Sequence, residues 1–146
     1  MTTNEMKNIE NSNFKKLIGT WKTTGNVTSG KDTLKLTGTD TYELILNGNY
    51  ILHKADVKMG NERSETLEII KLDNSYDKAT MQYYNTKGEE GKMRSSINNN
   101  EFKIKGKGLK FQGTITKENT IISGNWYIQT ENKKWTPFID LKLEKK

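Results

Sequence analysis

The whole chain after Gly19 is divided into short segments by frequent turn signals. These signals are rich in Gly and Asn, which tolerate the positive φ angles of tight hairpins. They occur at residues 25–26, 29–32, 47–49, 60–61, 73–75, 87–88, 98–100, 106–108, 117–119 and 131–133. No window has the 3.6-residue period of a long amphipathic helix. The spacing predicts an all-β chain of about ten strands, and the hairpin-length links favour an up-and-down antiparallel barrel over a Greek key.

The length of 146 residues fits a single domain with a core of its own. We expect a flexible N-terminal tail over residues 1–13 and one barrel domain over residues 14–146. A short helical turn at Phe14–Ile18 is expected to cap one end of the barrel. Hydrophobic residues make up only 32% of the chain, which indicates a polar outer surface and a partly polar interior.

The composition also restricts the location and the partners of the protein. The chain has no cysteine, and residues 1–13 lack the apolar segment of a secretory signal. No stretch approaches the ~18 apolar residues that span a bilayer. We therefore expect a cytoplasmic protein without integral membrane association.

The net charge of +6 permits contact with a polyanion, but the lysines of the densest stretch, 103–110, alternate with apolar residues. That pattern favours a solvated strand face, so no nucleic-acid partner is expected.

Alternation along each strand separates inward from outward residues, because successive side chains point to opposite faces. His53 shares its face with Ile51, Ala55 and Val57, which predicts that it points into the lumen. A ten-strand barrel is wider than a filled eight-strand one and leaves room for a ligand. The predicted lumen residues are Tyr42, Leu44, His53, Val57, Met81, Tyr83, Met93, Phe111 and Trp126, with Arg94 as a polar anchor for a ligand carboxylate.

The strand predicted over residues 64–72 is apolar on both faces, since Leu67 and Ile69 oppose Ile70 and Leu72. A strand of this kind lies either under a cap or at an interface. A homodimer is therefore one of the partners that the sequence allows.

A local motif ties this pattern to a known architecture. Leu17-Ile18-Gly19-Thr20-Trp21 resembles the opening of the lipocalin and calycin superfamily, and the remainder is similar to a bacterial lipocalin-like family of unknown function. The segments that carry the similarity are residues 40–43, 49–52, 68–73, 123–126 and 135–140. The resemblance implies a barrel of eight to ten strands that binds a small apolar or amphipathic molecule. It also implies a structural role for Trp21, which closes one barrel end.

The haem-binding nitrobindin-like barrels also open with Gly-x-Trp, and their axial histidine lies near the C-terminus. This chain has no histidine after His53. We therefore expect neither haem nor another cofactor. The sequence also lacks the cluster of His and carboxylate residues that a stable metal site needs, and none is expected.

The residues that could carry chemistry are few. His53 is the only histidine, and three interpretations stay open for it: an interior hydrogen-bonded residue, a ligand contact or a metal ligand. Asp40 shares its parity with Tyr42, so it is expected to point inward, where a carboxylate needs a partner. Arg63 and Arg94 are the candidates for that partner. No Gly-x-Ser-x-Gly elbow occurs, and no catalytic residue is assigned.

The leading hypothesis is a non-enzymatic protein that binds a small apolar or amphipathic ligand in the lumen. One alternative is an enzyme built around His53 and Asp40. The other is an interaction or self-association module that uses the basic face or the apolar strand at residues 67–72.

Overall fold

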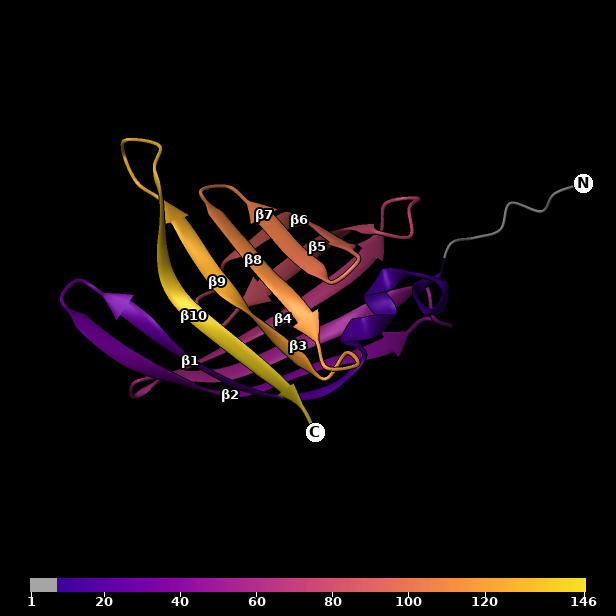
Figure 1. Cartoon of the computed structure of the whole chain (residues 1–146), viewed down its shortest axis with the longest axis horizontal. Coiled ribbons are helices and arrows are strands. Elements are labelled where there is room, and N and C mark those ends of the chain that lie inside the picture. Colours follow the sequence, from indigo (N-terminus) through magenta and orange to yellow (C-terminus); the bar gives the residue numbers. More distant parts are fainter. Residues whose placement is uncertain (1–7) are drawn as a thin grey trace, which may run out of the picture.

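The computed structural model describes residues 8–146, which form ten antiparallel strands and two short 3-10 turns (Figure 1). The strands are β1 (Gly19–Ser29), β2 (Asp32–Ile45), β3 (Tyr50–Met59), β4 (Glu62–Leu72), β5 (Lys78–Asn85), β6 (Glu90–Asn98), β7 (Glu101–Gly106), β8 (Leu109–Thr116), β9 (Ile121–Gln129) and β10 (Trp135–Lys145). Each strand pairs with its neighbours in sequence, and β1 pairs with β10 to close the barrel. The predicted fold class, an all-β up-and-down barrel of about ten strands, is confirmed.

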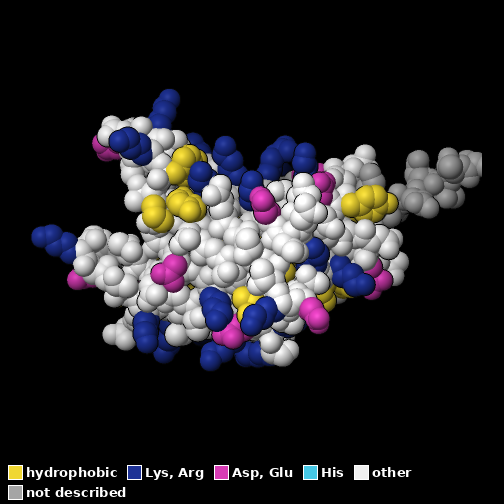
Figure 2. All heavy atoms as spheres, in the orientation of Figure 1, with side chains coloured by type: hydrophobic (Ala, Val, Ile, Leu, Met, Phe, Trp, Pro, Cys, Tyr) yellow, Lys and Arg dark blue, Asp and Glu magenta, His cyan; other side chains and the backbone are white. Residues whose placement is uncertain are grey.

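The alternation of side chains that predicted the strands is visible in their burial. In β7, Phe102 and Ile104 are buried, whereas Lys103 and Lys105 between and beside them are exposed. This confirms the solvated face predicted for the lysine-rich stretch. Figure 2 shows lysine and arginine side chains spread over several parts of the visible face, with aspartate and glutamate among them.

Closure of the barrel depends on the register of its first and last strands. Trp21 pairs with Lys145, and the ladder continues to Val27 and Ile139. The register between β9 and β10 shifts between Pro137 and Ile139, where the proline has no N–H to donate to the ladder. Because every strand then has two neighbours, the barrel presents no open sheet edge.

One end of the barrel is closed by the two 3-10 turns, η1 (Ile9–Asn11) and η2 (Asn13–Leu17) (Figure 1). Ile9, Phe14 and Leu17 are fully buried there. The indole Nε1 of Trp21, itself fully buried, donates a hydrogen bond of 2.8 Å to the Leu17 carbonyl. The predicted helical turn is confirmed, and we name η1 and η2 together with Trp21 the N-terminal cap.

Part of the predicted flexible tail contacts the barrel. Ile9 is buried, and its N–H donates to the Gly48 carbonyl in the turn between β2 and β3. The N–H of Asn13 donates to the Tyr76 carbonyl between β4 and β5. Residues 8–13 are thus held by the barrel, because an apolar residue at position 9 is available for its end. Residues 1–7 of the predicted tail lie outside the described residues.

The strand that is apolar on both faces is β4. Its inward side chains Ile70 and Leu72 are buried in the core, whereas Leu67 on the outer face is 38% exposed. Tyr84, the partner of Leu67 on β5, is exposed beside it.

Among residues 8–146, no helix is long and apolar enough to cross a membrane.

Candidate functional site

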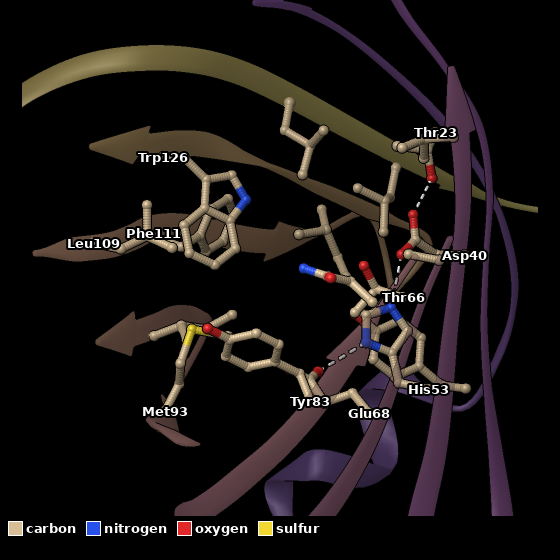
Figure 3. Close-up of a pocket in the computed structure, with 18 of the residues that line it drawn as sticks. Thr23, Asp40, His53, Thr66, Glu68, Tyr83, Met93, Leu109, Phe111 and Trp126 are labelled. Atoms are coloured by element: carbon tan, nitrogen blue, oxygen red, sulfur yellow. Dashed lines mark hydrogen bonds and ion pairs between the residues drawn. The ribbon is translucent and has the colours of Figure 1, made fainter. Parts of the chain in front are cut away.

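The barrel is only partly filled by its own side chains, and a cavity of about 390 Å³ occupies the part away from the N-terminal cap (Figure 3). That volume lies within the range of small-molecule sites, roughly 300–1,000 Å³. The cavity extends to Asn85, Glu89 and Leu109, which border the turns at the open end of the barrel. Its wall is formed by Thr23, Leu36, Asp40, Tyr42, His53, Ala55, Val57, Thr66, Glu68, Tyr83, Asn85, Glu89, Met93, Phe102, Ile104, Leu109, Phe111, Ile122, Trp126, Leu141 and Leu143.

His53 lies between two carboxylates on one side of this cavity. Its Nε2 is 2.7 Å from Asp40 Oδ1, and its Nδ1 is 2.8 Å from Glu68 Oε1. The three residues come from the adjacent strands β2, β3 and β4. In the β3–β4 ladder His53 is paired directly with Glu68, while Asp40 lies two residues from Tyr42, the partner of His53 on β2. The register of two consecutive hairpins, β2–β3 and β3–β4, therefore assembles the cluster.

The protonation of His53 follows from these contacts. Burial by itself lowers the pKa of the imidazole. The hydrogen bonds to Asp40 and Glu68 and the charges of both carboxylates outweigh burial and raise the pKa to about 9. At neutral pH the ring is an imidazolium that donates to both carboxylates. All three side chains are almost entirely buried.

Two neighbours hold the cluster in place. The hydroxyl of Thr23 on β1 donates a hydrogen bond to Asp40 Oδ2. The ring of Tyr42 stacks on the imidazole, with ring centroids 3.9 Å apart and planes at 6°. Burial, followed by the charges of Asp40 and Glu68, raises the pKa of the Tyr42 phenol well above its ordinary value. Tyr42 is therefore neutral throughout the physiological range.

The partner of Asp40 differs from the sequence prediction. Asp40 does point inward, but its partners are His53 and Thr23 and not an arginine. Arg63 instead forms a bidentate ion pair with Asp56 on the outer surface, with both N–O distances at 2.9 Å. Arg63 and Asp56 each alternate with the lumen residues of their own strand. Their side chains therefore point to the outer face.

The opposite side of the cavity is aromatic and apolar (Figure 3). The centroid of Phe111 on β8 lies 5.3 Å from that of Trp126 on β9, its direct partner in the ladder. On β5, the ring of Tyr83 lies over Gly91, where a Cβ atom would come within 2.8 Å of the phenol oxygen. The absence of a side chain at position 91 thus gives the tyrosine its place on the cavity wall.

Most of the sequence-predicted lumen residues meet at this cavity. Those that line it are Tyr42, His53, Val57, Tyr83, Met93, Phe111 and Trp126. Met81 and Leu44 do not. Met81 is fully buried in the packed part of the core, and Leu44 is half-buried beside the N-terminal cap. Both belong to the filled end of the barrel.

The prediction that Arg94 points into the lumen was wrong. Arg94 is exposed on the outer face of β6 and borders a surface depression with Lys103 and Lys105. Its neighbour Met93 lines the cavity. Because adjacent residues of a strand point to opposite faces, Arg94 has no access to the lumen and cannot anchor a ligand there.

Several polar residues of the site were missed in the sequence. Glu68 is the most important of them, since it is 95% buried and bonded to His53. The others are Thr23, Thr66, Asn85 and Glu89. Glu68 shares its parity with Ile70 and Leu72, and this was the available signal that a carboxylate points into the barrel.

The cluster is not arranged as a metal centre. In the described part of the chain, no group of three or more His, Asp or Glu side chains is placed to hold a metal ion. The carboxylates of Asp40 and Glu68 approach opposite nitrogens of His53, so the three side chains bind one another and do not converge on a common point.

Comparison with known proteins identifies a family but no function. The sequence profile of the family described as "Protein of unknown function (DUF1579)" matches residues 8–139. No curated protein matches the chain. Among solved structures, the chain is similar to the crystal structure of Rv2717c from M. tuberculosis, with a TM-score of 0.73 and 8% sequence identity over 91% of this chain and 94% of that chain. At that identity the similarity is one of fold alone.

Proposed function

The chain belongs to the DUF1579 family of proteins of unknown function, and from the lumen of its barrel we propose that it binds a small apolar or amphipathic molecule without catalysing a reaction. The observation that carries this proposal is the cavity of about 390 Å³ with an aromatic wall on one side and a compact polar cluster on the other. Ligand sites commonly combine apolar walls with a few polar groups that fix orientation. The resemblance to the lipocalin and calycin superfamily supports the same role.

The apolar wall is the source of affinity. Burial of apolar surface is favourable by roughly 25 cal/mol per Å², so a ligand that buries about 200 Å² gains about 5 kcal/mol before the costs of association. Leu109, Phe111 and Trp126 belong to this wall.

The arrangement of His53 gives less support to the alternative of an enzyme around His53 and Asp40. A general base needs an unprotonated nitrogen within reach of the substrate proton. Here Nδ1 and Nε2 both face carboxylates. The same contacts occupy the positions that an iron or zinc ion would need, which supports our proposal that His53 holds no haem or metal.

Binding in the lumen can be tested with the neutral fluorescent probe N-phenyl-1-naphthylamine. Ala55 lines the cavity, and its neighbour Lys54 is exposed on the outer face of the same strand. We expect saturable binding to the wild-type protein, a loss of about tenfold or more in affinity for Ala55→Phe and a change of less than about twofold for Lys54→Phe. Equal affinity of the wild-type and Ala55→Phe proteins contradicts the lumen as the binding site.

The chemistry of a natural ligand can be read separately. Native mass spectrometry of protein purified from its own host is expected to detect a co-purifying small molecule.

The partner predictions remain proposals: no nucleic acid, and a possible homodimer through the exposed Leu67 and Tyr84. Light scattering after size-exclusion chromatography tests the second of these.

A further inference from the structure

We propose that the lumen selects a cationic amphiphile, an alkyl- or arylammonium ion, whose charged head binds the carboxylate of Glu68 and whose apolar body lies against Phe111 and Trp126. This inference rests on the proposed function and specifies the ligand class that the site takes.

The first argument is the charge of the cavity wall. Three carboxylates line it, those of Asp40, Glu68 and Glu89, together with the single imidazole of His53. In the described part of the chain no lysine or arginine lines the cavity, although the chain has 24 basic against 18 acidic residues. Even with His53 protonated, the wall keeps a negative charge. A cationic ligand neutralises it, whereas an anionic head group is repelled.

The second argument is an acceptor that the protein leaves open. Glu68 Oε1 accepts from His53, but no hydrogen bond reaches its second oxygen, Oε2, from any of residues 8–146. No side-chain nitrogen or oxygen that is shielded from solvent lacks a partner in the same residues. Oε2 is therefore accessible, and because Glu68 is 95% buried on the cavity wall, the access is from the lumen. A carboxylate oxygen accepts strongly from a charged N–H donor.

The third argument is the path from the solvent. Glu89 is exposed at the turn between β5 and β6 and lines the outer part of the cavity. Asn85 donates to Glu89 Oε1 at 3.1 Å and pairs with Thr66 in the β4–β5 ladder. Thr66 is two residues from Glu68 on the same inward face. A row of polar side chains thus leads from Glu89 at the open end of the barrel, through Asn85 and Thr66, to the buried carboxylate of Glu68.

The fourth argument is the wall that faces this column. Figure 3 shows Trp126, Phe111 and Leu109 across the cavity from Glu68 and His53, with Tyr83 between them. An apolar tail that leaves the head group at Glu68 meets these rings. Arg94, the group expected to hold a carboxylate, lies outside the barrel.

The test compares three ligands with one tail and different head groups: octylammonium, octanol and octanoate. Their affinities for the wild-type protein are measured at pH 7 by isothermal titration calorimetry. We expect octylammonium to bind at least tenfold more tightly than octanoate, with octanol between them. Glu68→Gln is expected to lower the affinity for octylammonium at least tenfold and that for octanol less than threefold. Glu43→Gln, on the outer face of β2 where the residue is exposed, serves as the matched control and leaves all three unchanged.

The outcomes separate the two proposals. Octanoate binding as tightly as octylammonium, or octylammonium binding that is unaffected by Glu68→Gln, overturns the cationic ligand while binding of octanol still supports the lumen site. Failure of all three ligands to bind overturns both. The comparison of head groups on the wild-type protein needs no variant, so it decides the matter even where Glu68→Gln fails to fold.

Discussion

The ring of Tyr42 lies flat on the imidazole of His53, with centroids 3.9 Å apart and planes at 6°. The two residues are direct partners in the β2–β3 ladder. The stack fixes the plane of the imidazole, and this plane aims one nitrogen at Asp40 and the other at Glu68. An aromatic side chain thus orients a charged cluster that would otherwise depend on the two carboxylates alone.

The energy of this stack can be measured by a double-mutant cycle. Aromatic pairs contribute about 0.5–1.5 kcal/mol beyond their buried area, so Tyr42→Leu and His53→Gln should be coupled by about that amount in urea unfolding. Tyr42→Phe keeps the ring and is expected to retain most of the coupling. Strict additivity of Tyr42→Leu and His53→Gln means that the stack adds no stability.

The stability of the protein should fall as the pH rises through the titration of His53. An unfolded histidine has a pKa near 6.5, and the folded one has a pKa of about 9. The raised pKa contributes stability that is fully present below pH 6.5 and is lost as the pH rises to about 9, because the folded state alone holds the proton in that window. The full loss is on the order of 3 kcal/mol.

The control for this prediction is His53→Gln, which removes the titrating group. Urea unfolding of both proteins between pH 6 and pH 9.5 should give a falling free energy of unfolding for the wild type relative to the variant. Parallel pH profiles contradict the protonated cluster. Since His53 is the only histidine, an NMR titration of its ring can locate the pKa directly.

The hydroxyl of Thr23 is expected to stabilise the cluster from the next strand. Thr23 is buried and donates to Asp40, so Thr23→Val leaves one carboxylate oxygen without its donor. A loss of about 1–3 kcal/mol in the free energy of unfolding is the usual cost. Thr24→Val, on the opposite face of β1, is the matched control. Equal losses for the two variants refute a specific role for the Thr23 hydroxyl.

Strand alternation made much of this site predictable. It placed His53 and Asp40 inside, because the side-chain period of two is strict along a strand. The same rule excludes Arg94 once Met93 is placed in the lumen, so that error was avoidable from the sequence. Glu68 was harder to predict, because a carboxylate on a buried strand face is explained only by its contact with His53 on the neighbouring strand.

The position of a residue along the barrel axis could not be predicted from the strand pattern. Met81 points inward as expected, yet it is buried in the packed part of the core. Which end is filled depends on the N-terminal cap, through Ile9 and Phe14. Ile9 lies in a segment whose polar composition indicated a tail. A contact between the start of the chain and the turns of distant strands leaves no local signal.

The shape of the lumen should respond to Gly91→Ala. A Cβ atom at this position would lie 2.8 Å from the Tyr83 oxygen and 2.9 Å from its ring carbons, so the ring has to move. We expect the affinity for N-phenyl-1-naphthylamine to fall by about threefold or more, while stability changes by less than about 1 kcal/mol. Adding Tyr83→Leu removes the clash and should recover part of the affinity. Unchanged affinity of the single variant means that Tyr83 does not shape the binding site.

The N-terminal cap should be separable from ligand binding. Trp21 is fully buried, donates to the Leu17 carbonyl and is not part of the cavity wall. Trp21→Phe removes the donor and part of the packed ring, which is expected to cost about 1–3 kcal/mol in the free energy of unfolding. The affinity for octanol should stay within about twofold, because the cap lies at the filled end of the barrel. A large loss of octanol affinity in a protein that remains folded would instead make Trp21 part of the binding machinery.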